Sequence, residues 1–464
     1  MKTIFSFYSL NRFFALPLQK NKRIIIHNHL QMVNKQILRL ALPSMVSNIT
    51  VPLLALVDVA IVGHLGAAAY IGAIAVGGTI FNVIYWVFGF LRMGTSGLTS
   101  QALGRRDLTE VVALLLRSIG ISLAVALCFI LFQRLLLDGA LWLMHPSPQV
   151  ATLASVYFGI LIWGAPAMLG MFSVTGWLIG MQNTRLPMLV AIVQNVANIA
   201  VSMLLVFVFG MKIEGVAYGT LIAQYVSLLL ALVLSGCVYG RLQHYLRWPR
   251  VWLRSSLRQF FKVNRDIFLR TLCLVSVMLF FTTAGSWQGE TVLAVNTLLM
   301  QFSLLFSYIM DGFAYAAEAL SGKYYGAGNK AALRSTVHHL FRWGWLMAAF
   351  FTLLYMVGGQ SFLSLLTDEP SVVEASSAYY LWALALPVVG MAAYIWDGVH
   401  IGCTATRAML LSMLLSAVAF FTAYAVSIRY MGNHGLWLAF LLFLAVRSVV
   451  LWRCWSKTMR KYKG

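Results

Sequence analysis

Four acidic residues lie inside long apolar stretches of the sequence, namely Asp58, Asp311, Glu318 and Asp397. An ionised carboxylate in hydrocarbon costs on the order of 3 kcal/mol or more, so it is kept where it faces water, is paired, or carries a proton. Asp58 is the only acid between Leu42 and His64, a run of membrane-spanning length. Pro43 and Pro52 lie in the same run, and proline weakens the helical hydrogen-bond ladder. The run predicts a bendable helix with one buried proton acceptor; the alternative is a structural Asp bonded to a neighbouring helix.

The other three acids are weaker candidates for coupling. Asp311 and Glu318 are seven residues apart, which places them on one face of a helix. Asp397 is near the end of its apolar stretch and is followed by Gly398. Glu318 and Asp397 are equally well explained as solvated helix ends.

A polar stripe marks the apolar segment 187–210. Asn195, Asn198 and Ser202 are spaced by three and four, so they share one helical face. Such stripes can simply join helices. Counting along the predicted spans places Ser202 and Thr220 at about the depth of Asp58, in the outer half of the bilayer. A carboxylate, an amide and two hydroxyls there predict a proton site or a small-cation site, because hard cations take oxygen ligands.

The composition indicates which elements position these residues. Of 464 residues, 61% are hydrophobic and only 10% charged, whereas a soluble globule carries about 25% charge. We therefore expect an all-α polytopic membrane protein. The five cysteines are scattered through apolar segments, which favours core residues over a disulfide or metal framework.

Twelve spans are predicted, at 40–64, 71–99, 112–133, 151–174, 187–210, 215–238, 267–286, 292–320, 335–357, 375–399, 407–428 and 434–453. With both termini inside, 29 Lys and Arg residues fall on the inner side and three on the outer side, while Arg92 and Arg447 lie deep in spans. The net charge of +21 is then an orientation signal, not a nucleic-acid footprint. We expect a multi-pass protein of the cell (inner) membrane with cytoplasmic termini.

The basic segment 239–266 follows the sixth span and divides the chain into a 32–238 lobe and a 267–464 lobe. It is predicted to be a cytoplasmic linker containing a basic amphipathic helix. Two strings recur 222 residues apart: 180–185 matches 402–407, and 101–104 matches 323–326. Because six spans intervene, the repeats are parallel, which places a substrate site between the lobes.

Residues 1–31 are basic and free of acids. They are expected to be a disordered extension, a targeting peptide or the product of a mis-assigned start codon. A chain beginning at Met32 is expected to insert and function.

The sequence contains no phosphate-cradling loop, HExxH zinc motif or nucleophile elbow. We therefore expect no enzyme activity and no cofactor. Transport would be driven by an ion gradient, because the chain has no nucleotide-binding domain.

The chain resembles the multidrug and toxic compound extrusion (MATE) family, in its DinF-type branch. The matching strings are LALPSMVSNITVPLLALVDVAIVGHLG at 40–66, FLRMGTSGLTSQALG at 90–104, NRDIFLR at 264–270, MDGFAYAAEALSG at 310–322 and LPVVG at 386–390. The resemblance extends from Met32 to the carboxyl end. It implies two six-helix lobes around a central cavity, and alternating-access efflux of lipophilic, often cationic compounds against proton or sodium entry.

The resemblance also implies roles for single residues. The family's amino-lobe acid falls on Asp58, its partners on Asn198 and Thr220, and its kink-forming proline on Pro43. Ser202 stands where the family often has a second acid, which disfavours a sodium site. In the carboxyl lobe the family can use acids in spans seven and ten; span seven has none here, which leaves Asp397 as a weak candidate.

We therefore predict a proton-coupled exporter of lipophilic cations, acting as a monomer on small-molecule substrates in the bilayer. Sodium coupling, with Na⁺ bound near Asp58, is one alternative. A flippase of lipid-linked sugars is another, disfavoured because four acids face only two bases deep in the spans. A non-transporting receptor or scaffold is disfavoured by the parallel duplication.

Overall fold

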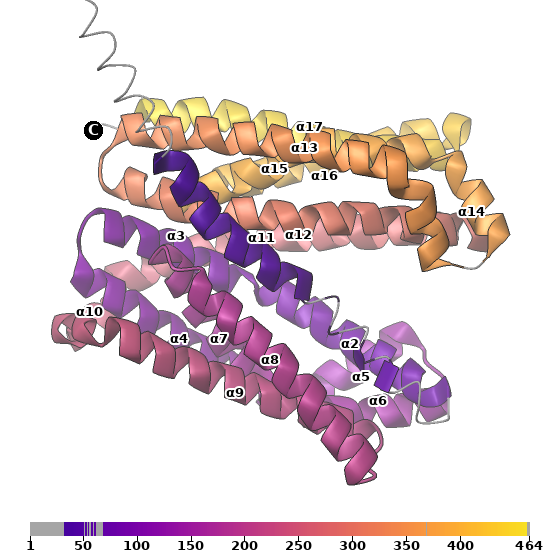
Figure 1. Ribbon diagram of the computed structural model, residues 1–464, viewed down its shortest axis with the longest axis horizontal. Coiled ribbons are helices and arrows are strands. Elements are labelled where there is room, and N and C mark those ends of the chain that lie inside the picture. The colour runs from indigo at the N-terminus through magenta and orange to yellow at the C-terminus, as the bar shows by residue number, and fades with distance from the viewer. Residues whose placement is uncertain are drawn as a thin grey trace, which may run out of the picture.

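The computed structural model describes residues 32–50, 52, 54, 57, 58, 60, 61, 68–367 and 369–461. The extension 1–31 lies outside these ranges, as do several residues of the run that contains Asp58. Within the described residues every regular element is a helix (Figure 1). The first helix occupies residues 32–50 and passes through Pro43 without a break, and residues 52, 54, 57, 58, 60 and 61 are also helical.

The remaining elements are, in chain order, α2 (Ala68–Phe88), α3 (Phe90–Gly104), α4 (Leu108–Leu131), α5 (Gln133–Met144), α6 (Pro148–Leu161), η1 (Ile162–Gly164), α7 (Ala165–Gly180), α8 (Arg185–Met203), η2 (Leu204–Val208), α9 (Ile213–Tyr239), η3 (Gly240–Tyr245), α10 (Trp248–Val251), α11 (Arg254–Ser286), α12 (Glu290–Gly326), α13 (Lys330–Leu366), α14 (Pro370–Ser377), α15 (Tyr380–Gly402), α16 (Thr406–Met431) and α17 (Asn433–Lys461).

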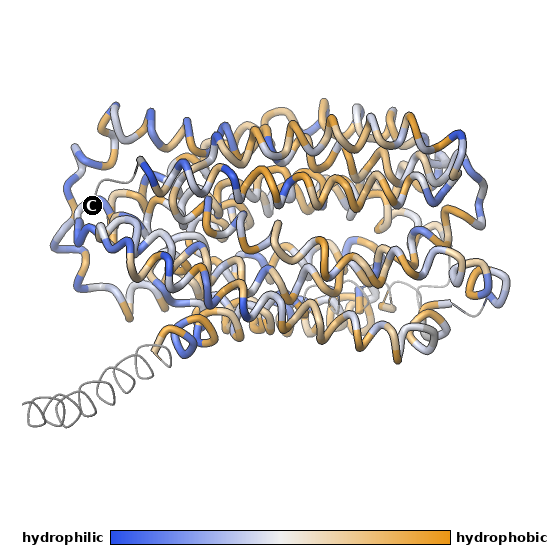
Figure 2. The backbone as a smooth tube through the Cα atoms, turned by 90° about the horizontal axis from the view of Figure 1, so that it is seen from above, coloured by the Kyte–Doolittle hydropathy of each residue, from blue (hydrophilic) through white to orange (hydrophobic). Residues whose placement is uncertain are grey.

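Eleven helical stretches in the described part of the chain are long and apolar enough to cross a membrane. Together with the first helix they account for the twelve predicted spans, and the all-α polytopic fold is confirmed. Apolar residues cover most of their length, and polar residues gather at the ends (Figure 2). Helices α3, α7, α12 and α15 all end on the same side of the molecule. We call this side the basic end, because Arg105, Arg106, Lys330 and Arg407 lie there.

The helices form two bundles (Figure 1). We call them the N-lobe, with α2–α9, and the C-lobe, with α12–α17. The C-lobe core is rich in aromatic rings, such as Phe302 against Tyr355 and Phe281 against Trp437. In the N-lobe, Phe81 stacks on Phe158. Side chains of this size hold each bundle together through apolar burial.

Each lobe receives the beginning of a helix from the other half of the chain. Ile37, Leu40 and Met45 of the first helix are buried in the C-lobe core. Conversely, Phe260 and Ile267 of α11 are buried in an N-lobe core cluster. The lobes in space therefore differ from the segments 32–238 and 267–464, because the first helix and α11 both begin on the opposite lobe.

Backbone geometry confirms the internal repeat. Gln182 and Thr404, which are 222 positions apart, both have positive φ, and so do Arg106 and Gly328, at the same spacing. These residues form the turns that follow α7, α15, α3 and α12. Residues 222 positions apart therefore turn the chain in the same way, as expected of a duplicated unit.

Contacts across the lobes at the basic end follow the same symmetry. Gln101 Nε2 donates to the Gly402 carbonyl at 2.8 Å and to Thr404 Oγ1 at 3.0 Å. Lys323 Nζ donates to Gln182 Oε1 at 3.1 Å. Since Gln101 corresponds to Lys323 and Thr404 to Gln182, a pseudo-twofold axis passes between α3 and α12, as parallel repeats require.

The 239–266 segment does not form one amphipathic helix. It contains η3 and α10, and from Arg254 it is already the beginning of α11, which continues to Ser286. Arg117 of α4 explains the arrangement: its buried guanidinium donates to the carbonyls of Val251 and Arg250 at 2.8 Å each. It also binds Glu110 at 2.9 Å, so a paired charge fixes the end of α10 against the N-lobe.

Candidate coupling site

In the N-lobe, the structure leaves Asp58 half-buried and without an ion-pair partner among the described residues. Its Oδ1 atom is buried and accepts no hydrogen bond from the residues that the structure describes. Tyr157 of α6 is electrostatically coupled to it. A carboxylate placed this way is free to bind a proton or a cation.

The polar stripe of α8 faces α9. Asn198 Nδ2 donates to Thr220 Oγ1 at 2.8 Å, and the Thr220 hydroxyl donates to the Val216 carbonyl at 3.1 Å. Ser202 is fully buried where α9 approaches at Gly219; a Cβ added to Gly219 would lie 2.1 Å from Ser202 Oγ. Asn198 Oδ1 and Ser202 Oγ have no hydrogen-bond partner within the described ranges, so two polar groups remain available there.

The structure therefore joins Asn198 to Thr220 by a hydrogen bond and places Ser202 at the contact between the same two helices, α8 and α9. No hydrogen bond links Asp58 to these three within the described ranges. Asn195 has a different contact: its amide donates to the Thr50 carbonyl of the first helix at 3.3 Å. Asn195 thus connects α8 to the end of the first helix.

In the C-lobe, the structure excludes one of the two alternatives for Asp397, that of a solvated helix end. Its carboxylate accepts hydrogen bonds from both Arg270 of α11 and Arg447 of α17, and the residue is only 7% exposed. Helix α15 continues to Gly402, so Asp397 lies within it, covered by two neighbouring helices.

The same alternative is excluded for Glu318, which is 1% exposed. Arg92 of α3 lies 3.4 Å from its carboxylate and 4.3 Å above the ring of Tyr315. Helix α12 runs two further turns to Gly326, which keeps Glu318 away from water. This pair joins the two lobes.

Asp311 differs from both of these acids. It is half-buried and forms no ion pair within 4 Å in the described part of the chain. Arg92, Arg270 and Arg447 are nonetheless close enough to interact with it electrostatically. The four acids therefore sort into two that are paired, Glu318 and Asp397, and two that are not, Asp58 and Asp311.

Sequence reasoning missed Arg270 as a member of this cluster, because it was assigned to an inner span end. The signal that could have found it is the length of α11, which begins at Arg254 and places residue 270 near its middle. The charged residues deep in the spans are then four acids and three bases, not four acids and two bases as predicted. The balance of these charges therefore distinguishes a cation exporter from an anion carrier less sharply.

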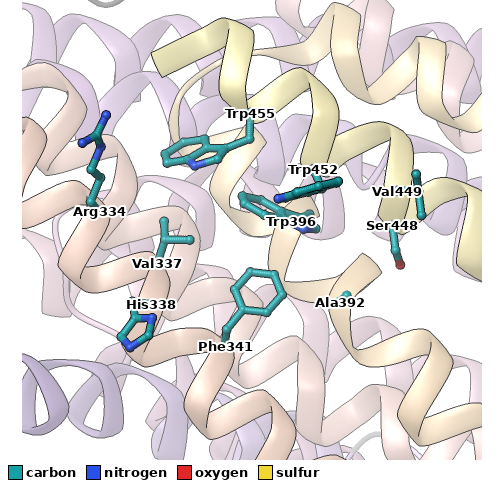
Figure 3. A pocket seen from close by; sticks show the side chains of 10 residues that line it. All are labelled: Arg334, Val337, His338, Phe341, Ala392, Trp396, Ser448, Val449, Trp452 and Trp455. Atoms are coloured by element: carbon teal, nitrogen blue, oxygen red, sulfur yellow. The ribbon is translucent and has the colours of Figure 1, made fainter. Parts of the chain in front are cut away.

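A cavity of about 460 Å³ lies between α13, α15 and α17. Trp396, Trp452 and Trp455 gather around it, with Arg334 at its edge (Figure 3). None of the four acids lines it, so it is separate from the coupling groups.

Comparison with known proteins agrees with this arrangement. The MatE family model matches residues 43–204 and 267–424, one segment in each half. The chain is 34% identical to the DNA damage-inducible protein F of Escherichia coli, covering 94% of this chain and 95% of that protein. It is 23% identical to a probable multidrug resistance protein NorM of Thermotoga maritima, covering 90% and 91%.

Among solved structures, the fold is similar to that of a multidrug resistance MATE family transporter in an outward-facing conformation, with a TM-score of 0.80 and 19% identity over 92% of this chain and 97% of that one. The matched halves, the similarity along almost the whole chain and the shared fold show that this chain belongs to the MATE family of membrane transporters.

Proposed function

We propose that this transporter exports lipophilic cations in exchange for protons, with Asp58 as the coupling carboxylate. The observation that carries the proposal is the buried Asp58 Oδ1, which has no hydrogen-bond partner among the described residues. An acid in this position is a functional site by default, because a carboxylate with only a structural role would be paired. Glu318 and Asp397 illustrate that structural alternative.

The proposed cycle uses groups already described. A proton neutralises Asp58 from the acidic outer side, and the Asn198–Thr220 pair stabilises one protonation state by hydrogen bonding. Pro43 allows the first helix to bend once the charge is removed. Substrate and proton then bind in alternation because they favour different conformations.

The lobes touch at the basic end through Gln101, Lys323 and their partners. If the basic end is cytoplasmic, as the charge distribution predicts, the described conformation is closed towards the cytoplasm.

Sodium is the alternative coupling ion. Ser202 favours proton coupling over sodium coupling, because a hydroxyl stands where a second carboxylate would strengthen a sodium site.

A flippase of lipid-linked sugars is the second candidate function. The observation that favours it is the sharing of one carboxylate, Asp397, by Arg270 and Arg447, since surplus guanidinium groups bind phosphate. Asp311 opposes it, because its carboxylate offsets that surplus charge.

The test uses purified protein in vesicles with an imposed pH gradient and no sodium. Uptake of a fluorescent lipophilic cation, with release of protons on its addition, supports the proposal. Flux that requires sodium would show that Na⁺, and not the proton, is the coupling ion. Movement of a labelled polyprenyl-phosphate sugar without cation flux would establish the flippase.

A further inference from the structure

A groove of about 1,560 Å³ opens at the basic end between α11 and the start of α16. Five of its lining side chains are cationic: Arg254, Arg258, Lys262, Arg265 and Arg407. No acid lines it, and all five cations are exposed. The groove is therefore a concentrated positive surface, separate from the coupling acids.

The cations follow one face of α11. Arg254, Arg258 and Lys262 are four residues apart, so they project in a row along the helix. Across the described residues, none of these three forms an ion pair, and neither does Arg407. Only Arg265 does, with Asp266 at 2.9 Å. The groove thus presents four cations that form no ion pair with any side chain in the described part of the chain.

The groove also has apolar walls. Leu257 and Phe261 line it, and Phe261 is 55% exposed. From Arg254 to Arg265 the helix rises about 16 Å at 1.5 Å per residue. Its deeper part meets α16 where Thr406 Oγ1 donates to Asp266 at 3.1 Å, at the start of the apolar span. The groove therefore extends from the exposed beginning of α11 to the start of the apolar stretch Thr406–Met431.

We propose that this groove binds the headgroup of an anionic phospholipid from the leaflet at the basic end. The free cations match the phosphate charge, and juxtamembrane clusters of Lys and Arg attract anionic lipids. Leu257 and Phe261 match the first carbons of the acyl chains. A soluble phosphate would use the cations but leave Phe261 in water, so the apolar walls favour the lipid.

The lipid would contact both halves of the transporter. The opposite face of α11 is buried in the N-lobe through Phe260 and Val263, whereas Arg407 belongs to the C-lobe. A headgroup held by Lys262 and Arg407 therefore lies across the seam between the lobes at the basic end.

The test is native mass spectrometry of the purified protein titrated with phosphatidylglycerol or phosphatidylcholine. The groove variant carries Arg258→Gln, Lys262→Gln and Arg407→Gln. The matched control carries Arg241→Gln, Arg247→Gln and Arg460→Gln, which removes three exposed charges from the same end outside the groove. We expect wild type and control to prefer phosphatidylglycerol, and this preference to fall about tenfold or more in the groove variant.

A further titration adds excess inorganic phosphate. Retention of phosphatidylglycerol under these conditions supports the lipid, whereas its displacement by phosphate would overturn the proposal in favour of a soluble anion. An equal loss of preference in both variants would also overturn it, because the effect would then be general surface charge. Thermal unfolding of both variants shows whether they remain folded.

Discussion

Arg92 of α3 and Glu318 of α12, 226 residues apart in the chain, form a buried ion pair at 3.4 Å that connects the two lobes. Removing one partner of such a pair leaves an uncompensated buried charge, which costs on the order of 3–5 kcal/mol. Arg92→Gln is expected to lower the thermal unfolding temperature markedly. The double variant Arg92→Gln/Glu318→Gln should recover part of the loss, because no charge is then left unpaired. Additive losses in the double-mutant cycle would contradict an interaction between the two.

Asp58→Asn reproduces the permanently protonated carboxyl. We expect normal expression, retained substrate binding, and loss of nearly all proton-driven efflux, because the variant has no group left to release the proton. Ser202→Ala is the matched control and should have a mild effect, since it removes no titrating group. Substrate-induced proton release from vesicles measures both. Wild-type exchange in Asp58→Asn would place coupling elsewhere, and Asp311, the other unpaired acid, would be tested next.

Asp397 has a different predicted role, because its loss would leave two buried guanidinium groups without a carboxylate. Asp397→Asn is expected to destabilise the protein by several kcal/mol, on the scale of a broken buried pair. Arg270→Gln should have a smaller effect, since Arg447 still pairs with Asp397. Unfolding temperature and yield in detergent report the difference. A larger effect for Arg270→Gln would show that pairing is not what keeps Asp397 in place.

Gly97→Ala tests the contact between the lobes. A Cβ at residue 97 would lie 2.3 Å from the Ile401 carbonyl, too close for the lobes to pack as described. Cys403, which is 4% exposed, provides the reporter. With the other four cysteines changed to serine, Gly97→Ala should raise maleimide labelling of Cys403 several-fold. Gly236→Ala is the control, because its Cβ would meet nothing within 4 Å. Unchanged labelling in Gly97→Ala would mean that the contact tolerates the methyl group.

The orientation is tested with accessible tags. Tags at either terminus or within 239–247 should be reached only from the cytoplasm, because the predicted spans place 29 basic residues on one side and three on the other, and the basic side is expected to be cytoplasmic. A tag within 358–374, around α14, should be reached from outside intact cells. Protection of that tag in intact spheroplasts would require the opposite orientation.

The sequence was sufficient for the spans and the duplication, because both depend on local patterns: apolar length, and strings repeated 222 residues apart. It also identified Asn198 and Thr220, through the family resemblance, and the structure joins them directly. It could not reveal that Glu318 and Asp397 are paired, because their partners are more than 45 residues away in the chain. Nor could it show that the first helix and α11 begin on the opposite lobes, since lobe membership depends on packing.

The backbone contacts at the basic end have a consequence for how tightly ions are retained. A Cβ at Gly104 would meet the Lys323 carbonyl, and one at Gly326 would meet the Gln101 carbonyl, so main chain lies against main chain across the seam. The Gln101 and Lys323 side chains bond across the seam beside these contacts, but at Gly104 and Gly326 the two surfaces meet through backbone. Backbone cannot swing aside as a single side chain can, so opening requires α3 and α12 to separate as whole helices. A transporter closed in this way can hold a steep gradient without an uncoupled current.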